Sequence, residues 1–265
     1  MRAILFCLLV LSNSGCWLRN HMFIHEDEQA AHSGKPILPH PVLLSSSFSE
    51  IHQGIRENGP PPGSCTQQEG WIVLSGPGLF QRFDFKSLVD SEHFWNLELM
   101  TAGETVIQLE KRGDQMQLVA PALGEDVKGG VDQIGERLAL TPWGALLGRA
   151  VEALPYQEFN PRLNWRVEQD GIKHMIFSRI LQHPDHPMKI DLYINKLHRV
   201  VTRRLEISLD HLDCDTRFSS YMEVDSTLMP RRTTILLPRS RQSARIYLRS
   251  GKILPGRQNG QLKLL

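Results

Sequence analysis

The stretch MKIDLYI, residues 188–194, alternates apolar and polar side chains along its whole length. Side chains in a strand change sides at every residue, so one side of this strand is apolar. That side carries Met188, Ile190, Leu192 and Ile194. The alternation returns in ARIYLR, residues 244–249, and residues 163–248 together indicate five or six short strands. The sequence therefore predicts a sheet with one apolar and one polar face.

Residues 70–120 also have the character of strands. The run Trp71-Ile72-Val73-Leu74 is apolar throughout, and Gly76-Pro77-Gly78 ends it. A second alternating stretch places Trp95, Leu97 and Leu99 on one side. Arg112-Gly113-Asp114 has the composition of a hairpin turn. Strands are thus expected on both sides of the middle of the chain.

Two helices are expected. Residues 47–56 place Phe48, Ile51 and Ile55 on a common face. Thr141-Pro142 has the residues of a helix start, and the helix should end before Pro155. Its apolar stripe contains Leu146, Leu147, Ala150, Val151 and Leu154. Gly144 and Gly148 weaken this helix, so it could move like a lid, or the same stripe could simply pack on the sheet as core.

The first residues have the pattern of a secretory signal. Met1-Arg2 is positively charged, residues 3–11 are apolar, and small residues follow. We expect residues 1–15 to be this signal and Cys16 to be a lipidated mature N-terminus, with ordinary signal-peptidase cleavage as the alternative. Ser14-Gly15 before Cys16 resembles the bacterial lipobox, but Asn13 stands where that pattern has an aliphatic residue. Trp17, rather than Asp, favours the outer membrane by resemblance to the sorting rule of proteobacterial lipoproteins.

Residues 16–45 contain scattered Pro, His and Ser without sustained periodicity, which is typical of a flexible tether. Residues 46–265 are expected to form a single domain. Cys65 and Cys214 are the two cysteines left in that domain. An exported protein permits a disulfide between them, but sequence alone does not decide whether they pair.

Positive charge gathers near the end of a chain whose formal net charge is only +1. From Pro230 onward there are nine basic residues and no acidic one. Such a segment suits an anionic partner. We expect a lipid headgroup rather than a nucleic acid, and the alternative is a solvated strand face whose arginines prevent edge-to-edge aggregation. The residues concerned are Arg231, Arg232, Arg239, Arg241 and Arg245.

The motifs of common enzyme classes do not occur in the sequence. There is no GxSxG, HExxH, P-loop or GxGxxG pattern, and no interpretable carboxylate pair. Residues 183–187, His-Pro-Asp-His-Pro, are better explained as a loop than as a metal site, because two prolines stop strand pairing. We therefore expect a protein that is not an enzyme, with no cofactor and no metal.

The order of strands and turns in the second half resembles the outer-membrane lipoprotein carriers and receptors, the LolA/LolB-like proteins. The likeness begins at residues 188–194, continues through a turn at 195–200 and a strand at 201–209, and includes the Leu-Met-Pro step at 228–230. The last strands, at residues 233–238 and 244–248, are also similar. The expected helix at 142–154 lies where these proteins often carry a lid.

The resemblance implies a mainly β (α+β) fold: a curved antiparallel sheet, or incomplete β-barrel, of roughly 9–11 strands covering a few helices. It also implies an apolar cavity that binds acyl chains or lipoproteins in the bacterial envelope, in a monomer anchored to the outer membrane and facing the periplasm. A palmitate-sized chain is the expected guest. The cavity residues would be Trp95, Leu97, Leu99, Leu146, Leu147, Val151, Met188, Ile190, Leu192 and Ile194. The alternatives are a closed core without a guest, and an envelope sensor or assembly lipoprotein of the same fold that binds a protein partner.

Overall fold

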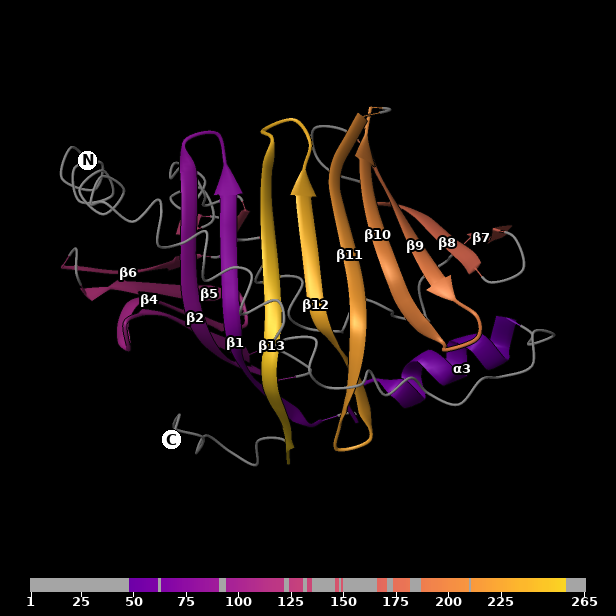
Figure 1. The fold of residues 1–265 in the computed structure, drawn as a ribbon, viewed down its shortest axis with the longest axis horizontal. Coiled ribbons are helices and arrows are strands. Elements are labelled where there is room, and N and C mark those ends of the chain that lie inside the picture. The colour runs from indigo at the N-terminus through magenta and orange to yellow at the C-terminus, as the bar shows by residue number, and fades with distance from the viewer. Residues whose placement is uncertain are drawn as a thin grey trace.

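The computed structural model describes residues 48–61, 63–90, 94–121, 124–130, 133–134, 146–147, 149, 166–170, 174–181, 187–209 and 211–255. They form one helix of defined bounds, α3 (Phe48–Asn58), and a single antiparallel sheet of 13 strands (Figure 1). The first six strands are β1 (Cys65–Gly76), β2 (Leu79–Asp90), β3 (Phe94–Thr101), β4 (Glu104–Arg112), β5 (Gln115–Ala120) and β6 (Glu125–Gly130). The other seven are β7 (Arg166–Asp170), β8 (His174–Leu181), β9 (Met188–Asn195), β10 (Val200–Ser208), β11 (His211–Val224), β12 (Thr227–Leu237) and β13 (Gln242–Leu254).

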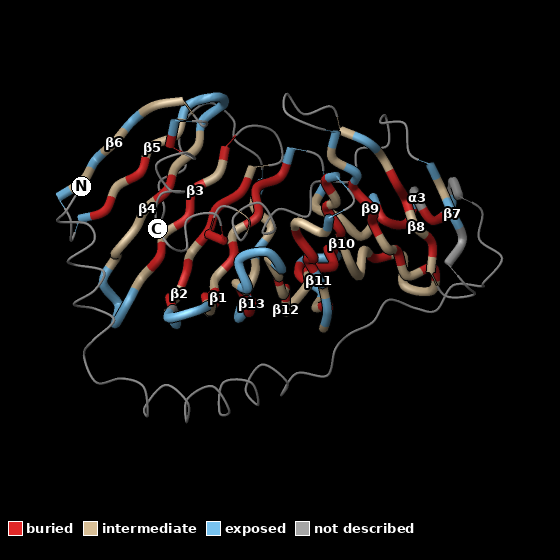
Figure 2. The backbone as a smooth tube through the Cα atoms, turned by 90° about the horizontal axis from the view of Figure 1, so that it is seen from above, coloured by how far each residue is buried: buried red, intermediate tan, exposed pale blue. Residues whose placement is uncertain are grey.

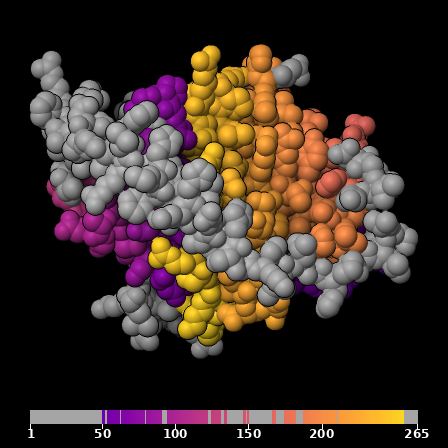
Figure 3. All heavy atoms as spheres, in the orientation of Figure 1, coloured from indigo at the N-terminus to yellow at the C-terminus, as the bar shows by residue number. Residues whose placement is uncertain are grey.

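Each half of the chain is a meander, and the two meanders join where the first strand pairs with the last. The strand order is β6-β5-β4-β3-β2-β1-β13-β12-β11-β10-β9-β8-β7. Figure 3 shows the consequence, with indigo residues from the start of the domain directly beside yellow ones from its end. Among the described strands β6 and β7 are the two edges, so the curved sheet stays open and is not closed into a barrel (Figure 2).

A glycine permits the junction between β1 and β13. The register between these strands shifts at Glu69/Gly70, where β13 has one extra residue. A Cβ atom at residue 70 would lie 1.9 Å from the carbonyl oxygen of Tyr247. Only a residue without a side chain allows the two backbones to approach this closely. Gly70 therefore matters for joining the two meanders.

The two faces of the sheet differ, as the alternation predicted. We call the core face the side to which Ile72, Phe85, Leu97 and Ile246 point, and the outer face the side of Trp71 and Tyr247. Large core-face side chains such as Phe85, 1% exposed, each contribute about 1.5–3 kcal/mol by burial. Figure 2 shows buried segments on the strands from β5 through β1 and β13 to β8, whereas the edge strand β6 has none.

The mainly β, curved antiparallel fold is confirmed, and the number of strands exceeds the roughly nine to eleven expected. Residues 166–254 form seven strands where five or six were predicted. The helix expected at residues 47–56 is α3, which runs two residues further. No helix in the described part of the chain has both the length and the apolar character needed to cross a bilayer.

Candidate functional site

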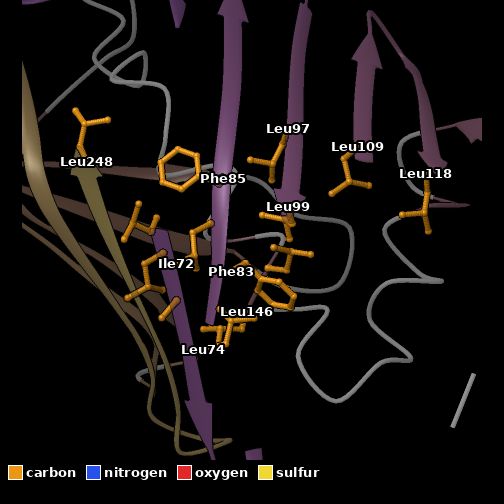
Figure 4. Packing of buried hydrophobic residues seen from close by; sticks show 14 of the residues in the cluster. Ile72, Leu74, Phe83, Phe85, Leu97, Leu99, Leu109, Leu118, Leu146 and Leu248 are labelled. Atoms are coloured by element: carbon orange, nitrogen blue, oxygen red, sulfur yellow. The ribbon is translucent and has the colours of Figure 1, made fainter. Parts of the chain in front are cut away.

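The largest group of buried side chains covers the core face of β1–β5 and β11–β13. We call it the large cluster. Residues from distant strands meet in it, and Figure 4 shows Ile72 and Leu74 of β1 near Phe83 and Phe85 of β2, with Leu99 of β3 alongside. Ile134, Leu146 and Leu147 from the segment between the meanders complete it. This cluster is an apolar surface built by eight strands and covered by residues that connect the two halves.

A second group of buried side chains lies on the core face of β8 and β9, where α3 covers it. We call it the helix-covered cluster. Ile51 and Ile55 of α3 are buried against Met175, Phe177 and residues of β9. The end of α3 is fixed by Asn58, whose Nδ2 donates hydrogen bonds to the carbonyl oxygens of His198 and Arg199, at 3.2 and 3.1 Å. The core face thus has two separate apolar clusters.

The residues predicted to line one cavity are divided between these clusters. Leu97, Leu99, Leu146 and Leu147 belong to the large cluster, and Trp95 packs against it. The helix-covered cluster contains Ile190, Leu192 and Ile194, and Met188 packs against it. Val151 and Cys16 lie outside the described residues.

Leu146 and Leu147, predicted to shield the cavity as a lid, are both fully buried. Figure 4 shows Leu146 among the side chains of the large cluster. Residues 146, 147 and 149 are helical. Arg149 extends from the same segment to the core face of β10, where its Nη2 lies 2.9 Å from Oε2 of Glu206. The leucines and the arginine together hold this segment against the sheet.

Glu206 is a buried carboxylate in an otherwise largely apolar face. Its Oε1 lies 2.8 Å from Nη2 of Arg204, so two guanidinium groups contact the two carboxylate oxygens. Cys214 stands opposite Glu206 on β11, and burial raises the pKa of its thiol. Cys65 and Cys214 are not joined by a disulfide and belong to different clusters. Among the described residues no three His, Cys, Asp or Glu side chains gather as metal ligands.

Comparison with known proteins finds solved structures with a similar fold. No family model matches the chain, and no curated protein matches its sequence. A LolA superfamily protein from Nitrosomonas europaea superposes with a TM-score of 0.55 at 12% identity, covering 82% of this chain and 96% of that one. A putative outer membrane lipoprotein-sorting protein domain from Vibrio parahaemolyticus gives 0.54 at 11% identity, covering 79% and 93%. A DUF1329 family protein from Desulfovibrio piger gives 0.58 at 12% identity, covering 81% and 93%.

The fold is LolA-like. At identities of 11–12% the similarity concerns the course of the chain. The strand order anticipated from residues 188–248 is the part of that resemblance which the structure bears out.

The five arginines predicted to face an anionic partner do not share one surface of the LolA-like sheet. Arg232 and Arg245 point to the outer face, because they pair with Tyr247 and Val73. Arg239 and Arg241 lie in or beside the turn between β12 and β13, and the Arg239 Nε atom is 3.3 Å from Oδ1 of Asp213. Arg231, between two outward residues of β12, points to the core face.

The outer face carries a group of aromatic and basic side chains that the sequence patterns did not single out. The rings of Trp71 and Tyr247 are stacked, with centroids 5.2 Å apart. The guanidinium groups of Arg82 and Arg249 lie 5.5 and 5.6 Å from the Trp71 ring centroid, and that of Arg232 lies 5.5 Å from the Tyr247 centroid. The alternation of Tyr247 with arginines in residues 244–249 was visible, but the opposing Trp71 was not.

Further along the outer face, Asp215 joins two arginines. Arg203 donates hydrogen bonds from Nε and Nη2 to the two carboxylate oxygens, at 2.8 and 2.9 Å, and Arg217 donates to Oδ2 at 2.8 Å from its Nη2. Burial alone would raise the pKa of Asp215, but these hydrogen bonds lower it below the ordinary value. The hydrogen bond to Asp215 raises the pKa of Arg203 in turn.

Proposed function

We propose that this protein is an exported, non-enzymatic carrier or receptor that binds acyl chains or lipoproteins on the core face of its sheet. The observation that carries the proposal is the large cluster, an apolar surface spread over eight strands of an open sheet. An apolar face of a sheet must be covered, and here we propose that residues 146, 147 and 149 share that role with a guest. The names of two structural neighbours, a LolA superfamily protein and a lipoprotein-sorting domain, also support a role in lipoprotein binding.

The energetics of such binding need no reactive group. Each buried methylene contributes about 0.8 kcal/mol, so a palmitate-sized chain is a strong guest for an apolar surface. Leu146 and Leu147 occupy part of that surface. We propose that the segment carrying them acts as the lid, leaving the large cluster when a chain enters and returning when it departs.

The proposed location follows from the N-terminal residues. An acyl group on Cys16 would anchor the protein to the bacterial outer membrane, and residues 16–45 would tether the domain on the periplasmic side. Both features are sequence expectations. Replacing Cys16 with Ser should move the protein from the membrane to the soluble fraction, and unchanged membrane association would refute the anchor.

Native mass spectrometry of the full chain tests the proposed ligand class. The protein should retain acyl-containing molecules after gentle purification and release them to an excess of fatty acid. A parallel titration should show displacement of a fluorescent fatty acid by unlabelled palmitate. If the protein retains no lipid and the fluorescent fatty acid is not displaced, the large cluster is only a closed core.

The outer face supports a second candidate, an envelope sensor or assembly protein that binds an anionic partner. Arg82, Arg217, Arg232, Arg245 and Arg249 all lie on it, and the charges of an anionic partner complement such a surface. Pull-down from envelope extracts separates the candidates, since a carrier yields lipids and many lipoproteins and a sensor yields one stable partner. Binding to anionic vesicles should weaken with salt, because exposed charges are screened over about 8 Å at physiological ionic strength.

A further inference from the structure

Arg231 and Arg232 are adjacent in β12 and point to opposite faces of the sheet. Arg232 pairs with Tyr247, and its guanidinium lies over the ring of that tyrosine on the outer face. Residues on either side of Arg231 at spacing two, Met229 and Thr233, are buried on the core face. Strand alternation therefore directs Arg231 toward the side that is proposed to bind acyl chains.

Arg231 lies at an interruption of both neighbouring ladders. On one side, β12 pairs with β13 only from Arg232 to Leu237. On the other, β12 pairs with β11 through Pro230 and Arg232, but no partner pairs with Arg231 itself. Ser220, which stands across from it in β11, has a left-handed backbone with φ of 54°. Such conformations in residues other than glycine are uncommon, and they occur often where a ligand is held.

Beyond this interruption the side chain of Met229, rather than strand pairing, contacts β13. A Cβ atom at Gly251 would lie 3.2 Å from the Met229 sulfur. The surroundings of Arg231 on the core face are thus an apolar side chain on one side and the buried Thr233 hydroxyl on the other. Neither of these two neighbours along β12 carries a carboxylate for the guanidinium group.

The Nε atom of Arg231 is buried and has no hydrogen-bond partner within the described structure. A buried donor without an acceptor is costly. The Nε atoms of Arg179, Arg199 and Arg204 are also buried without a hydrogen bond. Arg204, however, contacts Glu206 through its Nη2, whereas Arg231 takes part in no ion pair within the described structure. An arginine often buries its apolar stem and keeps its guanidinium group in water. Because Nε belongs to the guanidinium group, that arrangement does not explain why this atom is buried. An acceptor supplied by a ligand would account for it.

We propose that Arg231 binds the anionic headgroup, a carboxylate or a phosphate, of an amphiphile whose alkyl chain lies on the core face. This inference rests on the proposed function. A guanidinium fork matches both oxyanions with two parallel hydrogen bonds, which an ammonium group cannot do. The site gives the carrier a preference for ionised over uncharged chains, with the headgroup fixed at the centre of β12 and the chain extending over the large cluster.

The test compares laurate with dodecanol, which have alkyl chains of the same length, by isothermal titration of the full chain. Wild-type protein should bind laurate about ten-fold more tightly than dodecanol, the usual effect of one charge-assisted hydrogen bond. Arg231→Gln should remove this preference, so that laurate and dodecanol bind with similar affinity. Arg232→Gln is the matched control, since it removes the same charge one residue away on the other face and should keep the preference. Dodecyl phosphate in place of laurate shows whether phosphate is accepted as well.

Each outcome decides the inference. Equal laurate-to-dodecanol ratios for wild type and Arg231→Gln, or the same loss in Arg232→Gln, would overturn it while the proposed function stands. Binding of neither compound by wild type would overturn both. Arg231→Met should unfold at the same temperature as wild type or higher, because it removes a buried unpaired donor, and yet lose the preference. A large loss of stability in that variant would instead assign Arg231 to the fold.

Discussion

Arg149 and Glu206 form an ion pair between the segment that connects the two meanders and the core face of β10, with 2.9 Å between Nη2 and Oε2. The carboxylate is 3% exposed and also contacts Arg204. In Glu206→Gln both Arg149 and Arg204 lose the negative charge that they contact. The substitution should therefore lower the unfolding free energy by about 3 kcal/mol. Urea unfolding measures this. Glu223→Gln, an exposed change on β11, should cost less than about 0.5 kcal/mol, and equal costs would contradict the account.

Leu147 tests the proposed lid. It is fully buried, so Leu147→Ala should cost about 2–5 kcal/mol, as should Leu109→Ala on β4, whose side chain is 1% exposed. The two variants should differ in lipid release, because Leu109 is fixed in a strand and Leu147 is in the proposed moving segment. Fluorescent fatty-acid release should be faster in Leu147→Ala than in Leu109→Ala. Equal release rates would make residues 146–149 plain core.

The pair of arginines around Asp215 predicts a dependence of stability on pH. The pKa of Asp215 is lower in the folded protein than in the unfolded chain, so its stabilisation is present above the unfolded pKa and is lost as pH falls through the folded pKa. The unfolding free energy of wild type should therefore fall more steeply below about pH 4 than that of Asp215→Asn. Urea unfolding from neutral to acid pH measures both, and parallel curves would refute the assignment.

The stacked pair on the outer face should matter for stability. Trp71 is 7% exposed, so Trp71→Ala should cost about 3 kcal/mol and weaken the near-ultraviolet circular dichroism of the aromatic pair. Phe80→Ala, at a side chain 40% exposed, should cost less than about 1 kcal/mol. A small cost at Trp71 would mean that the arginines around it, rather than the ring, shield this face.

The two buried thiols should be unreactive in the folded protein. Burial raises the pKa of Cys214, so little thiolate is present near neutral pH. Iodoacetamide should label neither Cys65 nor Cys214 before unfolding and both after it, without prior reduction. A requirement for a reductant would show that they pair.

Strands with strong alternation were predictable, and edge strands were not. Residues 188–194 and 244–248 alternate because one face is buried, and they became β9 and β13. The same signal is present in β2, where Phe83 and Phe85 alternate with Arg82 and Asp84. The edge strands β6 and β7 have few apolar residues, so no alternation marks them in the sequence. Backbone pairing with a neighbouring strand positions them.

Contacts between distant residues were beyond sequence patterns. The pairing of β1 with β13, which brings Trp71 to Tyr247, depends on how the two meanders join. Arg231 and Arg232 point to opposite faces because side chains alternate along β12. A count of basic residues in the sequence does not show this difference. No local sequence pattern predicts the ion pair of Arg149 with Glu206, because the two residues are far apart in the chain.

Photo-crosslinking of the full chain with a diazirine-bearing fatty acid tests the central claim most directly, because it reports where the chain lies. The account predicts that labelled peptides, identified by mass spectrometry, come from core-face residues of β1–β3 and β11–β13 and from residues 146–149, and that excess palmitate suppresses the labelling. Labelling confined to outer-face residues, or labelling that palmitate does not suppress, would contradict it.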